Sequence, residues 1–208
     1  MAKYRTEDFR TPICRLSYAA SLFKPRSQEG GKPKFGCTLI FKKEHRKELE
    51  ARVAEAIKGE WGDKGIEMAK KGLIKSPFLA GDGKEAHSSK TGELNAGMGA
   101  DVFFIRVSAN EDRAPAVWHR DPNKQETEAT VYSGCYGKAI LNCYTWDHPQ
   151  NGKGVSFGIQ GFQKHAEGER LGGSGEIDKS KWNETVEDAG DAPSETTGGA
   201  GAGGLFGE

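Results

Sequence analysis

The stretch VYSGCYGKAILNCYTW, residues 131–146, is the longest strand candidate in the chain. Side chains along a strand alternate between the two faces of its sheet, so the stretch separates into two sets. The set that contains Cys135 and Leu141 is small and mostly apolar, which suits the inner wall of a small β-barrel. The other set is rich in aromatic and polar residues, and its members are Tyr132, Gly134, Tyr136, Lys138, Ile140, Asn142, Tyr144 and Trp146.

Shorter strand candidates lie on both sides of this stretch. In residues 34–41 the alternation is clear, with Phe35 and Cys37 on one face and Lys34 and Thr38 on the other. Turn residues such as glycine, proline and asparagine separate the candidates. The remaining strand candidates are residues 11–18, 102–108, 116–119 and 155–165.

One segment has a helical pattern. Within residues 44–58, apolar residues recur at i, i+4 and i+8 from Leu49, and Gly59 is a plausible end of the helix. Residues 60–100 contain too few large apolar side chains for a core of their own. We expect them to be an insertion on the same domain, with a short second helix around residues 66–71.

The order of these elements predicts the fold class. We expect residues 116–119 to pair with residues 130–132 across the polar turn between them. Many strands, one main helix and glycine-marked bends favour a strongly curved sheet. The sequence therefore predicts a mainly β protein, with an OB-fold-like five-stranded antiparallel barrel, one main helix and elaborated loops.

The two parts of the chain differ in charge. Residues 173–208 contain eight acidic and two basic residues, so this segment carries −6. The whole chain has 30 residues of each sign, so residues 1–172 hold 28 basic and 22 acidic residues and carry +6. Apolar residues also become rare after this boundary. We therefore expect a folded domain over residues 1–172 and a disordered acidic tail over residues 173–208.

This charge contrast indicates two kinds of partner. A basic body meets a polyanion, and an acidic tail meets a protein or shields the body. Acidic, glycine-rich ends are often only solubilising, but the ending LFGE places apolar residues where no core receives them. Such a tip suits a small basic-rimmed pocket on a partner. The candidate partner-binding residues of the tail are Glu187, Asp188, Asp191, Leu205 and Phe206.

Aromatic and basic residues interleave in the body. Flat side chains that stack on bases, with cations that contact phosphates, are what a single-strand reader needs. The same aromatics are common on half-buried sheets, so stacking and core packing are both open for each of them. The alternation of its strand favours the core for Phe35. The candidate nucleic-acid-binding residues are Lys24, Arg26, Lys32, Lys34, Phe35, Arg106, Trp118, Arg120, Tyr132, Tyr136, Lys138, Tyr144, Trp146 and Lys153.

Signatures of catalysis are weak. The chain lacks G-x-S-x-G, a Walker-type phosphate loop and H-E-x-x-H. His119 with nearby Asp121 could mimic an acid–base pair, and no second acidic cluster supports a metal site. We therefore expect a protein that is not an enzyme and that uses no cofactor or metal.

Cysteine and hydropathy patterns favour a cytoplasmic protein. The four cysteines form no C-x-x-C pair and suit small buried thiols in a reducing compartment. No run of 18 apolar residues predicts a membrane span, and the N-terminus lacks the apolar stretch of a signal peptide.

Several motifs, in the same order over residues 13–173, resemble a family of bacteriophage single-stranded-DNA-binding proteins. The resemblance implies an OB fold, binding of single-stranded DNA without sequence preference, and a role in phage replication and recombination in the host cytoplasm. An acidic tail with an aromatic near its end is similar to the tails with which replication-type single-strand binders recruit partners. The motifs are RLSYAASLFKPRSQEGGKPKFGCTLIFKKE, WGDKG, LIKSPFLAGDGK, YSGCYGKAILNCYTWD and GKGVSFGIQGFQKHAEGERLGG.

Two other functions remain as hypotheses. The chain could be a binding module for a protein partner, such as an accessory factor of recombination, with its acidic tail as the main contact. It could instead be a nucleic-acid-processing enzyme that uses His119. A homodimer is a further expectation, because a short barrel strand leaves an exposed sheet edge.

Overall fold

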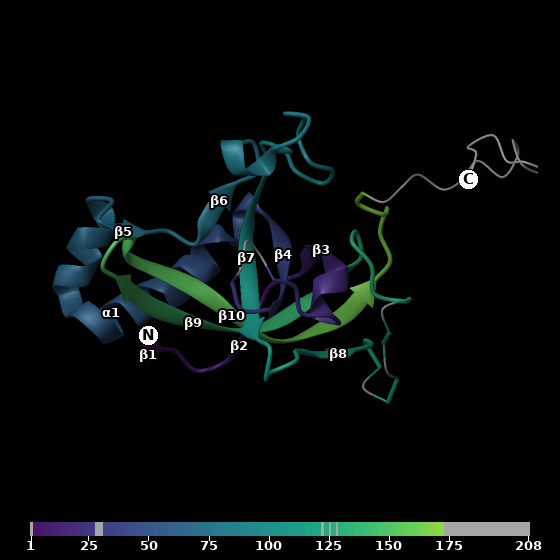
Figure 1. Ribbon diagram of the computed structural model, residues 1–208, viewed down its shortest axis with the longest axis horizontal. Coiled ribbons are helices and arrows are strands. Elements are labelled where there is room, and N and C mark those ends of the chain that lie inside the picture. The colour runs from purple at the N-terminus through teal and green to yellow at the C-terminus, as the bar shows by residue number, and fades with distance from the viewer. Residues whose placement is uncertain (1, 28–30, 122, 125, 128, 173–208) are drawn as a thin grey trace, which may run out of the picture. The chain divides into compact units, whose positions relative to one another are not determined.

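The computed structural model describes residues 2–27, 31–121, 123–124, 126–127 and 129–172 (Figure 1). The chain divides into two units, Met1–Gly173 and Ser174–Glu208, and the second unit lies outside the described residues. No helix within the described ranges is long and apolar enough to cross a membrane. The predicted tail disorder and the tail candidates lie outside these ranges, and those candidates are Glu187, Asp188, Asp191, Leu205 and Phe206.

Five strands close into a barrel. They are β3 (Cys14–Ser17), β4 (Lys34–Lys42), β7 (Val102–Asn110), β9 (Tyr136–His148) and β10 (Gly152–Ala166). They pair in the order β3–β4–β7–β10–β9, and β9 pairs again with β3 to complete the ring. The β7–β10 junction is parallel and the other four are antiparallel. The predicted five-stranded OB-type barrel is confirmed. One of its junctions is parallel, where the sequence predicted only antiparallel pairs, because five strands cannot alternate in direction around a closed ring.

The barrel interior holds the main core. Leu16, Leu39 and Leu141 are fully buried there, together with Phe157. The alternation predicted for residues 131–146 holds within β9, because its small apolar set is buried and its polar and aromatic set is half-buried on the other face, except Asn142, which is 1% exposed and donates to Asp8. Residues 131–135 precede the strand, so Tyr132 lies outside the strand on which the sequence placed it.

The N-terminal residues run along one edge of β9 in three short pieces. The pieces are β1 (Ala2–Arg5), β2 (Phe9–Arg10) and β3, and they pair with β9 in turn. Thr6 and Thr11 lie at the interruptions, where their hydroxyls accept hydrogen bonds from the backbone of β9 at 3.0 and 2.9 Å. These polar interruptions hide the pattern of β1 and β2, so the sequence did not predict these two strands.

One long helical element packs against the barrel. It begins at η2 (Lys43–His45) and continues as α1 (Arg46–Lys70), and Leu49 and Ile57 are buried as the pattern predicts. Gly62 interrupts the helix with φ 63° and ψ −156°, a conformation open to glycine. The short second helix that the sequence predicts is therefore the C-terminal part of the same element.

Three further strands extend the sheet. They are β5 (Ile74–Lys75), β6 (Phe78–Ala80) and β8 (Ala116–Trp118). The prediction that residues 116–119 pair with residues 130–132 is wrong, because β8 pairs in parallel with β10. Gly161 explains this pairing: a Cβ there would lie 2.6 Å from the Trp118 ring, so only glycine lets that ring pack on the backbone.

A second, smaller core covers part of the outer face of the barrel. Ile40 of β4 and Phe104 of β7 point outward and are buried with Ala86 and Leu171. Ala86 ends η3 (Lys84–Ala86) within residues 81–100, a segment that we name the cap. Figure 1 shows the cap at the top, beyond β6. The cap and Leu171 therefore cover the outer face of the barrel around Ile40 and Phe104, and the rest of that face is not covered by this core.

Candidate nucleic-acid interface

The outer face of β3, β4 and β7 carries polar residues in strand register. Ser17 lies opposite Thr38, and Thr38 lies opposite Arg106 on the next strand. The neighbouring row pairs Gly36 with Ser108. The residues between them along each strand are largely buried in the barrel, which places these side chains on its outer side, where Thr38 is itself buried at 5% exposed and the other members are half-buried or exposed. We name this surface the polar face, and it consists of Ser17, Lys34, Gly36, Thr38, Arg106, Ser108 and Asn110.

The centre of the polar face has little side-chain bulk. A Cβ at Gly36 would lie 2.6 Å from the backbone carbonyl oxygen of Val107, so this position accepts only glycine without a shift of the backbone. Ser108 opposite it is also small. A ligand can therefore approach the backbone of β4 and β7 closely at this row.

A short segment after β10 borders the polar face, and we name residues 167–171 the strap. Arg15 of β3 donates a hydrogen bond from Nη2 to the backbone oxygen of Glu169 at 2.8 Å. The backbone N–H of Leu171 donates to the oxygen of Ser133, also at 2.8 Å. Gly134 admits the strap, because a Cβ there would overlap the Glu169 oxygen. The strap thus covers the Arg15–Ile40 row beside the polar face.

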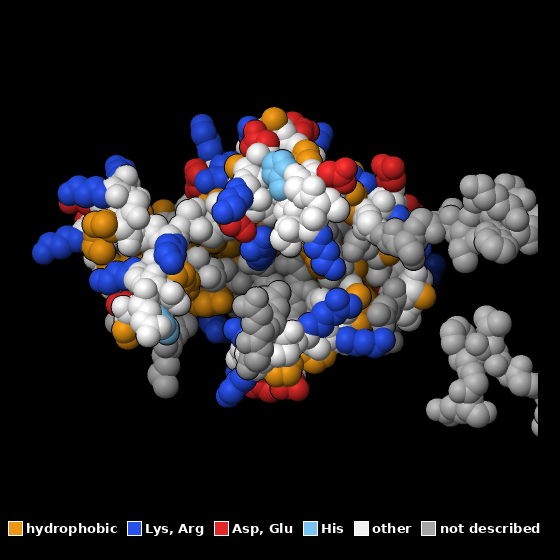
Figure 2. Space-filling model, turned by 45° about the horizontal axis from the view of Figure 1, so that its top comes forward, with side chains coloured by type: hydrophobic (Ala, Val, Ile, Leu, Met, Phe, Trp, Pro, Cys, Tyr) orange, Lys and Arg blue, Asp and Glu red, His pale blue; other side chains and the backbone are white. Residues whose placement is uncertain are grey.

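Three predicted cations gather on and beside this face. Arg106 is well exposed, and its Nη2 lies 3.2 Å from Oε2 of Glu85 on the cap. Lys34 is exposed, and its backbone exchanges hydrogen bonds of 2.9 and 3.0 Å with Arg26 of the preceding loop. The face of the molecule shown in Figure 2 has a hollow, and Lys and Arg side chains lie around it. Phosphates would meet positive charge here from two separate strands and one loop.

The remaining loop cations are close in sequence to this group. Lys32 is exposed and precedes β4 by two positions, while Lys24 follows η1 (Ala19–Leu22). Both therefore belong to the loop that joins β3 to β4. In OB folds this loop and the strands beside it form the usual binding surface for oligonucleotides.

The aromatic candidates of β8 and β9 pack against the sheet. Trp146 covers Gly154, where a Cβ would overlap its ring, and its Nε1 donates to Ser156 Oγ at 3.0 Å. Trp118 covers Gly161 in the same way. Such contacts between an aromatic ring and a glycine stabilise neighbouring strands. Each of these rings is half-buried, so one part of it already packs against the sheet.

The tyrosine candidates of β9 also have partners. The Arg5 guanidinium lies 5.9 Å from the centre of the Tyr144 ring, and the Arg15 guanidinium lies 5.6 Å from that of Tyr136. A Cβ at Gly168 would lie 2.8 Å from the Tyr136 ring, so this tyrosine also packs on the strap. Stacking of Tyr136 and Tyr144 on bases remains a prediction.

Two other aromatic candidates have structural positions. Tyr132 holds the strap: its hydroxyl donates to Glu167 Oε2 at 2.7 Å, and the Arg170 guanidinium lies 4.1 Å from its ring centre. Phe35 is 7% exposed and points into the barrel, because its neighbours Lys34 and Gly36 occupy the outer face of the strand. The assignment of Phe35 to stacking is therefore corrected.

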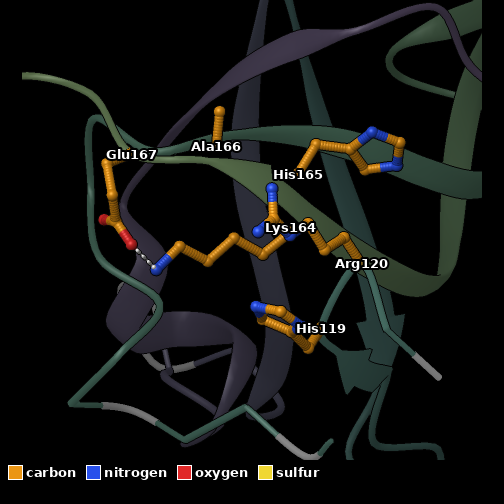
Figure 3. Close-up of a pocket in the computed structure, with 6 residues that line it drawn as sticks. All are labelled: His119, Arg120, Lys164, His165, Ala166 and Glu167. Carbon is orange, nitrogen blue, oxygen red and sulfur yellow. Dashed lines mark hydrogen bonds and ion pairs between the residues drawn. The ribbon is translucent and has the colours of Figure 1, made fainter. Parts of the chain in front are cut away.

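The structure does not bring the other predicted cations to the polar face. Lys138 and Lys153 belong to the β9–β10 hairpin, where Lys153 Nζ lies 5.8 Å from the Trp61 ring. Arg120 follows β8 and lines a small pocket with His119 and four residues of β10 and the strap (Figure 3). Contact of these three side chains with DNA remains a prediction, and it would require a strand of DNA that extends beyond the polar face.

An ion pair between Lys164 and Glu167 lies in the pocket shown in Figure 3. Lys164 is 6% exposed and donates to Glu167 Oε1 at 2.6 Å and to the Thr130 oxygen at 2.7 Å. Burial disfavours the Lys164 cation, but the hydrogen bond and charge of Glu167 outweigh it and raise the pKa of Lys164. Hydrogen bonds from Lys164 and then Tyr132 lower the pKa of Glu167. The charged Lys164 side chain thus binds Glu167 and holds the strap against β10.

His119 does not form the acid–base pair that the sequence suggested. Its Nδ1 accepts a hydrogen bond of 3.0 Å from the backbone N–H of Asp121, while the Asp121 carboxylate accepts from Asn123 instead. Its Nε2 lies 3.8 Å from Oε1 of Glu126. These contacts place His119 in the organisation of a loop.

Sequence reasoning missed several residues of this surface. Ser17 and Ser108 have ordinary side chains, and they belong to one surface only through the strand register. Tyr18, directly after Ser17, is 61% exposed. No pattern in the sequence distinguishes it from the buried aromatics.

An OB-type barrel with a cationic outer face and a basic loop belongs to the class of single-strand nucleic-acid binders. Comparison with known proteins agrees. A family model described as "Enterobacter phage Enc34, ssDNA-binding protein" matches residues 9–192. The chain belongs to this family.

Individual relatives point the same way. The chain is 29% identical over 168 residues to "Putative protein p50" of Acyrthosiphon pisum secondary endosymbiont phage 1, which covers 77% of this chain and 84% of the relative. The Enc34 protein in complex with ssDNA has a similar structure, with a TM-score of 0.60, 18% identity, and 79% and 89% of the two chains covered. For gp2.5 of bacteriophage T7, the TM-score is 0.53 at 12% identity, with 90% and 99% covered. At these identities the two structures establish the fold.

Proposed function

We propose that this protein binds single-stranded DNA without sequence preference during phage DNA replication and recombination. The observation that carries the proposal is the polar face, where Arg106 and Lys34 flank a floor of small side chains. Cations contact the phosphates, which every DNA sequence shares, so such a face binds independently of sequence. Membership of the Enc34 family supports the same function.

The charge of the body supports this function. Residues 1–172 carry +6, although the whole chain is formally neutral. Binding through lysine and arginine releases counterions from the DNA, so affinity falls as salt rises, with a slope of about 0.7 for each phosphate contact on a single strand. The protein would therefore bind most tightly at low ionic strength.

We further propose that the acidic tail recruits replication or recombination proteins in the host cytoplasm. Its net charge of −6 and its apolar tip suit a basic-rimmed pocket on such a partner. A homodimer is a separate proposal, which sedimentation of the full chain tests directly.

The experiment is a titration of the full chain with oligo-dT and with duplex DNA of equal length. Protein fluorescence and the anisotropy of labelled DNA are followed at two salt concentrations. Salt-sensitive binding of the single strand, with weaker binding of the duplex, supports the proposal. A lack of single-strand binding at low salt overturns it and favours the alternative of a protein-binding module.

A further inference from the structure

Tyr18 is unusual among the aromatic residues of the described chain. It is 61% exposed, whereas every other described phenylalanine, tyrosine and tryptophan is buried or half-buried. It follows Ser17 at the end of β3, so it lies at the edge of the polar face. It also opens the loop that carries Lys24 and Arg26.

The backbone of Tyr18 is in a conformation that tyrosine rarely adopts. Its φ of 59° and ψ of 41° lie in the left-handed region, and no other non-glycine residue of the described ranges has a positive φ. Such a conformation is disfavoured for side chains with a Cβ and persists only where the surroundings impose it. Strained positions of this kind concentrate at ligand-binding sites.

Contacts on both sides of Tyr18 impose this conformation. Before it, Leu16 is buried, and its backbone N–H and oxygen bond to Cys135 and Gly134 at 2.9 and 2.7 Å. After it, the N–H of Ala19 donates to Ser133 Oγ at 3.1 Å, and Ala19 is itself buried. The chain therefore turns at Tyr18 between two fixed points, and the turn directs a large ring into solvent.

We propose that Tyr18 is a base-stacking platform of the interface, an inference that rests on the proposed binding of single-stranded DNA. The strand register links Ser17 through the buried Thr38 to Arg106, and Tyr18 directly follows Ser17, so Tyr18 adjoins one end of a row whose other end is a cation. A base stacks on the exposed ring while the phosphates continue toward Arg106 and Lys34. The preset backbone fixes the point from which the ring projects before the DNA arrives, which reduces the entropy lost on binding.

Two substitutions separate stacking from structure. Glycine adopts a positive φ without strain, so Tyr18→Gly is expected to leave the melting temperature unchanged or higher. Its affinity for oligo-dT is expected to fall about 5- to 150-fold, the usual range for one stacked base. Tyr18→Phe keeps the ring and is expected to bind within about threefold of the wild type. Ile13→Ala, at another exposed apolar residue near β3, is the matched control with unchanged affinity.

The salt dependence gives a second readout. Tyrosine carries no charge, so the slope of log K against log salt is expected to be the same for Tyr18→Gly and the wild type. Wild-type affinity in Tyr18→Gly, or a lower melting temperature together with a reduced slope, would overturn the stacking role while leaving the proposed function intact. If the wild-type chain itself fails to bind oligo-dT, the proposed function fails and this inference fails with it.

Discussion

Arg106 on the polar face and Glu85 on the cap form an ion pair with 3.2 Å between Nη2 and Oε2. The Arg106 side chain is 60% exposed and the Glu85 side chain 53%, so both remain within reach of a ligand. A carboxylate in this position occupies the place that a DNA phosphate would take. If Arg106 contacts DNA as proposed, the cap competes with the ligand for this cation.

Replacement of Glu85 tests this competition. We expect Glu85→Gln to raise the affinity for oligo-dT by up to about fivefold, which is the scale of an exposed ion pair. The matched control is Glu55→Gln, which breaks the Arg52–Glu55 pair on α1. Anisotropy titrations at low salt measure both variants, and equal affinities for the two would contradict the competition.

Removal of the cation has the opposite effect. Arg106→Gln is expected to weaken binding and to lower the salt slope by about one phosphate contact. In this background Glu85→Gln is expected to change little, because the two side chains act through the same pair. An unchanged slope for Arg106→Gln would remove Arg106 from the interface.

The strap is expected to depend on Gly134. Its φ of 120° and the overlap that a Cβ at this position would have with the Glu169 oxygen leave no room for alanine. Gly134→Ala should therefore destabilise the protein by about 3 kcal/mol or more. Gly152→Ala, at φ 75° in open space, should cost only about 1–2 kcal/mol. Urea unfolding measures both, and equal losses would show that the strap does not depend on this contact.

The Lys164–Glu167 pair should make stability depend on pH. Because the folded-state pKa of Glu167 is lowered from 4.5, its contribution is present above about pH 4.5 and is lost as pH falls through the folded value. The stability difference between the wild type and Glu167→Gln should thus be largest near neutral pH and shrink in acid. Glu169→Gln is the control, since that carboxylate lies 4.0 Å from Arg15 and is 92% exposed. A difference that stays constant between pH 7 and pH 3 would contradict this role.

Deletion of residues 174–208 tests the role of the tail. Eight acidic and two basic residues are removed with this segment, so the remaining chain carries +6. We expect binding of oligo-dT to be unchanged or stronger, because a negatively charged competitor is lost. Weaker binding by the truncated chain would instead make the tail part of the DNA site.

The barrel could be predicted from the sequence because its signals are local. Alternation in residues 34–41 and 131–146, and the repeat from Leu49, correspond to β4, β9 and α1. The pairing of β8 could not be predicted, because it depends on the space that Gly161 leaves for a ring on another strand. The short strands β1 and β2 were hidden by the polar residues between them.

The interface was harder to predict than the fold. Lys34 and Arg106 were found as cations, but only the register of β4 and β7 places them on one surface. The aromatic face of β9 exists, yet its rings are half-buried against glycines and arginines. Composition cannot distinguish those rings from Tyr18, because exposure depends on contacts made by residues distant in sequence.

Photocrosslinking of the full chain to an oligo-dT that carries 5-iodouracil tests the central claim most directly. Peptide mass spectrometry then locates the crosslinks. The polar face predicts crosslinks within residues 15–38 and 102–110, including Tyr18. Crosslinks confined to Tyr144, Trp146 and the turn that joins β9 to β10 would contradict the account and move the DNA to the end of β9 that is remote from β3.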